Sequence, residues 1–82
     1  MIYDQLKEAN PAALTLAGFK KAYLGFALQA GNDALAVYDY DKCIDVLMDE
    51  ESMSREEAME SFAFNEAEEY FGENTPLILV RR

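Results

Sequence analysis

The 82-residue chain has no histidine, no tryptophan and one cysteine, and its seven basic residues face sixteen acidic ones. Without histidine, a catalytic triad and the commonest metal ligand are both absent. The single cysteine, Cys43, cannot form an intrachain disulfide, and its apolar setting predicts a buried thiol rather than a nucleophile. We therefore expect no enzyme activity, no cofactor and no metal.

Long apolar runs are also missing: none approaches the roughly 20 residues of a membrane-spanning helix, and no leader pattern opens the chain. Hydrophobic residues nevertheless make up 51% of the sequence, which is enough for a folded core. The sequence predicts one small domain over residues 1–82 in the reducing cytoplasm. The scarcity of lysine and arginine argues against direct binding to nucleic acid or to an anionic membrane.

Hydrophobic periodicity alternates between the helical and the strand spacing along the chain. The predicted elements are a helical turn over residues 2–9, a helix over 11–17, strands over 19–29 and 34–38 joined in a hairpin, helices over 41–50 and 54–70, and a strand over 77–80. This order, α-β-β-α-α-β, predicts an α+β fold with a three-stranded, mainly antiparallel sheet and helices packed against it. The apolar strand from Leu77 to Val80 is expected to be covered on both faces or to lie centrally in the sheet.

The second long helix has the strongest local signal, because Ser54 and Glu57 have the spacing of a capping box. Its predicted buried stripe consists of Met59, Phe62, Ala63, Ala67 and Tyr70. Phe64 falls at the edge of that stripe, near several glutamates. Either the helix bends and Phe64 completes the core, or Phe64 is an exposed contact residue among carboxylates.

One stretch carries the charge imbalance: from Asp49 to Glu73 there are ten carboxylates and one cation, Arg55, so it accounts for the whole net charge of −9. A solvated surface is the simplest interpretation. The one-sided charge also fits a face that occupies a basic surface, because carboxylates along a helix can imitate nucleic-acid phosphates. The candidate partner-binding residues are Asp49, Glu50, Glu57, Glu60, Phe64, Glu68 and Glu69.

Asp39, Asp41 and Asp45 form a candidate cation site, because their alternation is similar to a calcium loop. The central glycine of such a loop is missing, since Ile44 stands at its sixth position, and Glu50 at its twelfth lies in helical sequence. Capping of the helix that follows is the better interpretation of these aspartates.

Four segments together resemble a family of small accessory proteins carried by phages and prophages. They are Ala36 to Ile44, Met53 to Ala58, Phe62 to Asn65 and Gly72 to Pro76, and the resemblance covers roughly residues 36–80. The family has no assigned catalytic activity. By analogy with other phage proteins of this size, the resemblance implies an inhibitor of a host enzyme or of bacterial defence, of the anti-restriction or anti-CRISPR class.

These observations lead to a first hypothesis of a non-enzymatic, phage-type inhibitor in the bacterial cytoplasm. It would use an acidic helical face against the basic surface of a bacterial nucleic-acid-binding or defence protein. The alternative is a homo-oligomeric structural or assembly protein whose interface is the apolar strand from Leu77 to Val80 or the tyrosine-bearing face of the hairpin.

Overall fold

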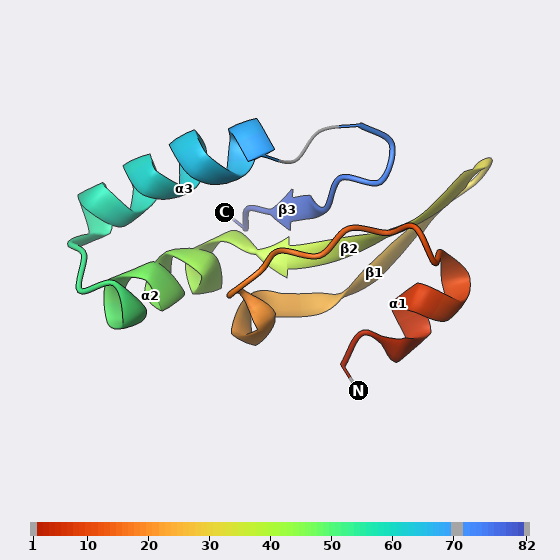
Figure 1. Cartoon of the computed structure of the whole chain (residues 1–82), viewed down its shortest axis with the longest axis horizontal. Coiled ribbons are helices and arrows are strands. Elements are labelled where there is room, and N and C mark those ends of the chain that lie inside the picture. Colours follow the sequence, from red (N-terminus) through yellow and green to blue (C-terminus); the bar gives the residue numbers. More distant parts are fainter. Residues whose placement is uncertain (1, 70–71, 82) are drawn as a thin grey trace.

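The computed structural model describes residues 2–69 and 72–81, with all their side chains except those of residues 29, 32 and 65–69 (Figure 1). The elements are α1 (Asp4–Ala9), the 3₁₀ helix η1 (Lys20–Ala22), β1 (Tyr23–Gln29), β2 (Asn32–Asp39), α2 (Tyr40–Glu50), α3 (Arg55–Glu69) and β3 (Leu77–Leu79). The predicted α+β class and the order α-β-β-α-α-β are confirmed. Residues 11–17, which are predicted to form a helix, are all described by the structure and form no helix.

The sheet is mixed rather than mainly antiparallel, with the strand order β1-β2-β3. The hairpin pairs β1 and β2 antiparallel, whereas β2 and β3 are parallel, with Tyr38 opposite Ile78. Helices α2 and α3 explain this direction: α2 leaves the end of β2, α3 runs back beside α2, and residues 72–76 then lead into β3 (Figure 1). A long crossover of this kind is what parallel pairing requires.

Asn10 explains why residues 11–17 do not form a helix. Its buried side chain donates to the carbonyl of Ala34 at 2.9 Å and to Oδ1 of Asn74 at 3.0 Å, and it accepts from the backbone N–H of Ala12 at 3.1 Å. Further along, the N–H of Leu16 donates to the hydroxyl of Tyr38 at 2.9 Å. The segment thus satisfies backbone groups through tertiary hydrogen bonds, which replace those of a helix.

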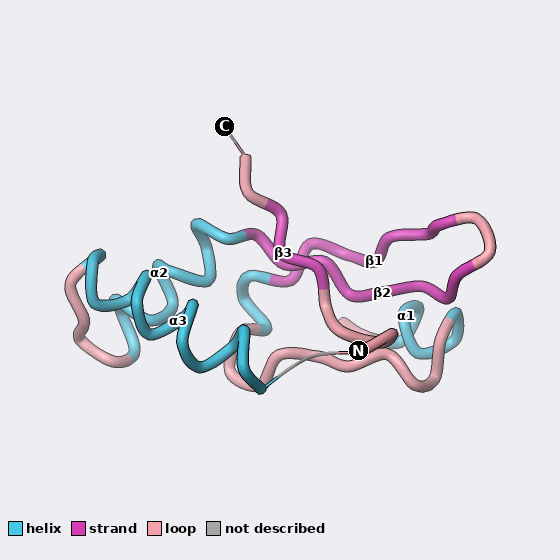
Figure 2. The backbone as a smooth tube through the Cα atoms, turned by 90° about the horizontal axis from the view of Figure 1, so that it is seen from above, coloured by secondary structure: helices cyan, strands magenta, loops and turns pink. Residues whose placement is uncertain are grey.

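One face of the sheet carries the core. Alternate residues of β2, namely Ala34, Ala36 and Tyr38, are buried beneath α1 and the segment after it, which supplies Leu16 and other apolar side chains. Figure 2 shows α1 and this segment on one side of β1 and β2, while no described helix lies on the other side. Leu35 of β2 is only half-buried, so the second face of the sheet is apolar and partly open.

The apolar sequence of β3 predicts a strand that is covered on both faces or central in the sheet, and this prediction is wrong. Strand β3 lies at the edge of the sheet, and Leu77, Leu79 and the following Val80 are 43–45% exposed. Only Ile78 packs against the core. The tyrosine-bearing face of the hairpin, in contrast, is turned toward the core. Tyr38 is fully buried and Tyr23 packs against it, with ring centroids 5.5 Å apart.

Candidate functional site

The start of α3 is held by the predicted capping box. The N–H of Glu57 donates to Oγ of Ser54 at 3.2 Å, and the N–H of Ser54 donates to the Glu57 carboxylate at 2.9 Å. The second of these bonds holds the pKa of the Glu57 carboxyl below its usual value, because the bond favours the ionised form. Glu57 is therefore a fixed negative charge at the first turn of the helix.

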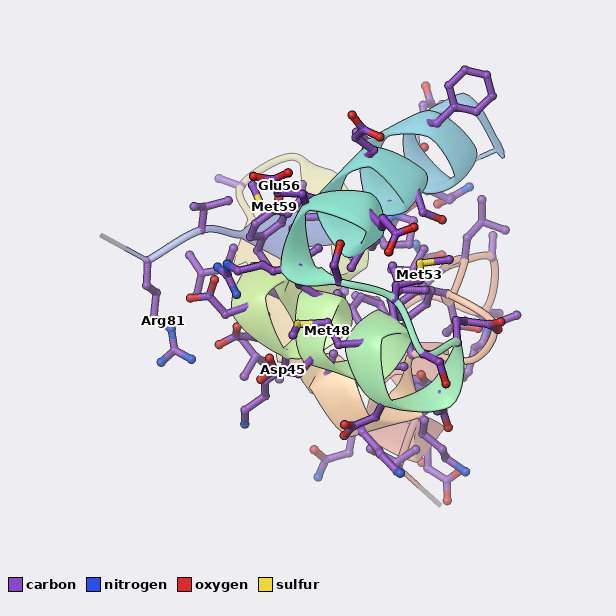
Figure 3. All side chains as sticks on the ribbon, turned by 90° about the vertical axis from the view of Figure 1, so that its left-hand side faces the viewer. Asp45, Met48, Met53, Glu56, Met59 and Arg81 are labelled. Carbon is purple, nitrogen blue, oxygen red and sulfur yellow. The ribbon has the colours of Figure 1, made fainter. Side chains whose placement is uncertain are left out.

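The buried stripe of α3 differs from the predicted one. Among the described side chains of α3, Ala58 and Phe62 are buried, which confirms the prediction for Phe62, and Phe62 anchors the helix through edge-to-face contacts with Phe19 and Tyr40. Met59 and Ala63, which are predicted to be buried, are exposed, and Figure 3 shows Met59 beside Glu56 on the flank of α3. Ala67 and Tyr70, the other predicted members of the stripe, lie outside the described side chains.

Phe64 is 69% exposed, which decides between the two alternatives: its ring does not complete the core. Phe64 follows Glu60 by four residues and Glu57 by seven, so these three side chains lie along one side of the helix. Both glutamates are exposed. We call Glu57, Glu60 and Phe64 the acidic α3 face.

The remaining candidate residues divide into two groups. Asp49 and Glu50 are exposed at the end of α2, where they line a small pocket together with Lys21 and Lys42. Two cations thus accompany this part of the acidic segment, and its charge is mixed. The side chains of Glu68 and Glu69 lie outside the described residues, so their part in the site stays a prediction.

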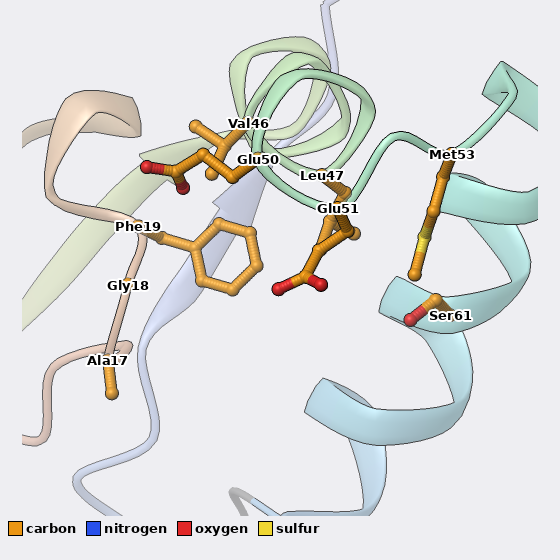
Figure 4. Close-up of a pocket in the computed structure, with 9 residues that line it drawn as sticks. All are labelled: Ala17, Gly18, Phe19, Val46, Leu47, Glu50, Glu51, Met53 and Ser61. Atoms are coloured by element: carbon orange, nitrogen blue, oxygen red, sulfur yellow. The ribbon is translucent and has the colours of Figure 1, made fainter.

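A larger pocket of about 410 Å³ lies between the segment 17–19, the end of α2 and α3 (Figure 4). We call it the interhelical pocket. It is lined by Ala17, Gly18, Phe19, Val46, Leu47, Glu50, Glu51, Met53 and Ser61. Among the candidate residues only Glu50 contributes to it. The other lining residues could not be grouped from the sequence, because they come from three separate segments. Of these, only Glu51 could have been identified as a candidate, since it belongs to the acidic stretch from Asp49 to Glu73.

Two aspartates of the candidate cation site, Asp39 and Asp41, have structural roles. Asp39 is buried, caps α2 by accepting from the N–H of Lys42 at 3.1 Å, and pairs with Arg81. Asp41 pairs with Arg55 across 3.4 Å. In the described part of the chain, no three acidic or cysteine side chains are grouped as a metal ion would need. The capping interpretation is confirmed for Asp39.

Two further expectations concern Cys43 and the membrane. The thiol of Cys43 is fully buried in the core, as predicted. None of the helices in the described ranges has the length and apolar character needed to cross a bilayer.

Comparisons with known proteins add no assignment. No family model, no curated protein and no solved structure matches this chain.

Proposed function

We propose that this protein is a non-enzymatic inhibitor of the phage accessory type, acting in the cytoplasm of a bacterial host. It docks the acidic α3 face against the basic surface of a bacterial nucleic-acid-binding or defence protein. The observation that carries the proposal is the exposure of Phe64, 69% accessible on the same side of the helix as Glu57 and Glu60. Large aromatic residues are the usual anchors of protein interfaces.

Charge supports the same conclusion. The segment from Asp49 to Glu73 has a net charge of −9, ten acids against Arg55. Arg55 itself pairs with Asp41, and it stands only two residues before Glu57, so it lies on another side of the helix from the acidic α3 face. A surface with this imbalance attracts a basic partner over a distance of about one Debye length, roughly 8–10 Å at physiological salt. Association should be fast at low salt and should weaken as salt rises.

The test is affinity capture from a bacterial lysate at low and high salt, using three immobilised proteins. The wild-type chain should retain a basic protein at low salt and release it at high salt. The double variant Glu57→Gln/Glu60→Gln should lose that protein, whereas the matched control Glu56→Gln/Glu8→Gln, which removes two exposed charges elsewhere, should retain it. Equal capture by both variants, or no salt-sensitive partner, would contradict the proposal.

A second candidate function, self-assembly, is favoured by a different observation. Strand β3 lies at the edge of the sheet and exposes Leu77 and Leu79, and the half-buried Leu35 of β2 extends the apolar surface on the same face. An open apolar edge of this kind can pair with a second copy. The burial of Tyr38, against which Tyr23 packs, removes the hairpin's other face from this alternative. Mass measurement at micromolar concentration tests it, because a monomer would eliminate the candidate.

A further inference from the structure

The interhelical pocket combines several apolar side chains with an acidic rim. Phe19 and Val46 form its buried inner wall, and the half-buried Leu47 and Met53 flank the opening. In Figure 4 the ring of Phe19 faces the space between α2 and α3, and the Glu51 carboxylate is directed toward the same space. The volume of about 410 Å³ falls within the range of roughly 300–1,000 Å³ that small-ligand pockets occupy.

The rim has charge of one sign. Glu50 and Glu51 are its two ionisable residues among the nine that line it. Within the described part of the chain, neither carboxylate has an ion pair or a side-chain hydrogen bond. Glu50 also lines the smaller pocket, together with Lys21 and Lys42, whereas Glu51 lines only the interhelical pocket of the two. The interhelical pocket therefore complements a ligand with an apolar body and a positive end.

We propose that the interhelical pocket receives an arginine side chain of the partner, an inference that rests on the proposed function. The aliphatic part of arginine would pack against Leu47 and Met53, whose thioether adapts readily to a contacting surface. The guanidinium would donate to the carboxylates of Glu50 and Glu51. Arginine fits better than lysine because its planar fork bonds carboxylates in pairs and it is more weakly hydrated.

The pocket is continuous with the acidic α3 face. Ser61, which lines the pocket, follows Glu57 by four residues and precedes Phe64 by three, so it is a helical neighbour of both. A partner that covers Phe64 would consequently also lie over the pocket opening. The arginine would give the interface a defined orientation, since a single pocket selects one side chain from a generally basic surface.

The experiment uses small probes, so that it does not depend on the unidentified partner. The ¹⁵N-labelled protein is titrated with N-acetyl-arginine methylamide and, separately, with the citrulline analogue, which has nearly the same shape without the charge. The arginine probe should give saturable shifts of the amides of Gly18, Glu51, Met53 and Ser61, with millimolar affinity. Equal shifts with citrulline, or no saturable shift, would overturn the proposal.

Two variants complete the test. The double variant Glu50→Gln/Glu51→Gln should weaken binding of the arginine probe about fivefold, as expected for two exposed charge pairs. Both side chains are exposed, so the fold should be retained. Glu56→Gln, outside the pocket, should leave the affinity unchanged. If the double variant binds the probe as the wild type does, the pocket proposal fails, while salt-sensitive capture through the acidic α3 face would still stand.

Discussion

Replacing Tyr38 by phenylalanine removes one hydroxyl from the centre of the fold. This hydroxyl accepts from the N–H of Leu16 at 2.9 Å and shares a hydrogen bond of 2.8 Å with the hydroxyl of Tyr3. Tyr38 is fully buried, so the Leu16 N–H would lose its acceptor without gaining water. An unsatisfied buried donor costs about 1–3 kcal/mol, and the lost Tyr3 bond adds about 1 kcal/mol. We expect a destabilisation of about 3 kcal/mol.

The assay is urea unfolding followed by circular dichroism, with Tyr40→Phe as the matched control. Tyr40 is half-buried and contacts Phe62 through its ring, which the substitution retains. The control should change the free energy of unfolding by less than about 0.5 kcal/mol. A loss of less than about 0.5 kcal/mol in Tyr38→Phe would refute the claim that this hydroxyl holds the segment after α1 onto the sheet.

Three further predictions concern the same framework. Asn10→Ala should lower the free energy of unfolding by about 2–3 kcal/mol, because three hydrogen bonds of a buried amide are lost; an effect below about 1 kcal/mol in urea unfolding would contradict this. Ser54→Ala should cost about 1 kcal/mol through loss of the cap, as measured by thermal unfolding, and because the Ser54 backbone N–H that lowers the folded-state pKa of Glu57 remains in the variant, wild type and variant should both lose stability as pH falls through that pKa. Burial raises the pKa of Tyr38, so stability should be fully present below the unfolded value of about 10 and should fall at higher pH, with a shallower fall in Tyr38→Phe.

Local chemistry was predictable from the sequence, and tertiary contacts were not. The capping box of Ser54 and Glu57 depends on residues three apart, and it is present as predicted. The helix expected after Pro11 is missing because Asn10 bonds to Ala34 and Asn74, which are far away in the sequence. Proline and asparagine were rightly identified as a boundary, but the partners of the amide could not be inferred from local spacing.

In the candidate site, too, local spacing was not enough to predict which residues are buried. Apolar residues occur at several phases of α3, so periodicity alone placed Met59 in the core where Ala58 is buried instead. Because the predicted stripe was displaced by one position, Phe64 fell at its edge, and the sequence could not decide whether the Phe64 ring is buried or exposed. The parallel direction of β3 likewise follows from how α2 and α3 pack against each other, which a hydrophobic pattern does not specify.

The most direct test of the acidic α3 face is the affinity of the captured partner for Phe64→Ala, measured at several salt concentrations. Phe64 is 69% exposed, so this substitution should leave the free energy of unfolding nearly unchanged. If Phe64 anchors the interface, affinity should fall by at least about 30-fold, the equivalent of roughly 2 kcal/mol for an interface hot spot. Because the charges remain, the salt dependence should persist. Unchanged affinity would contradict the account.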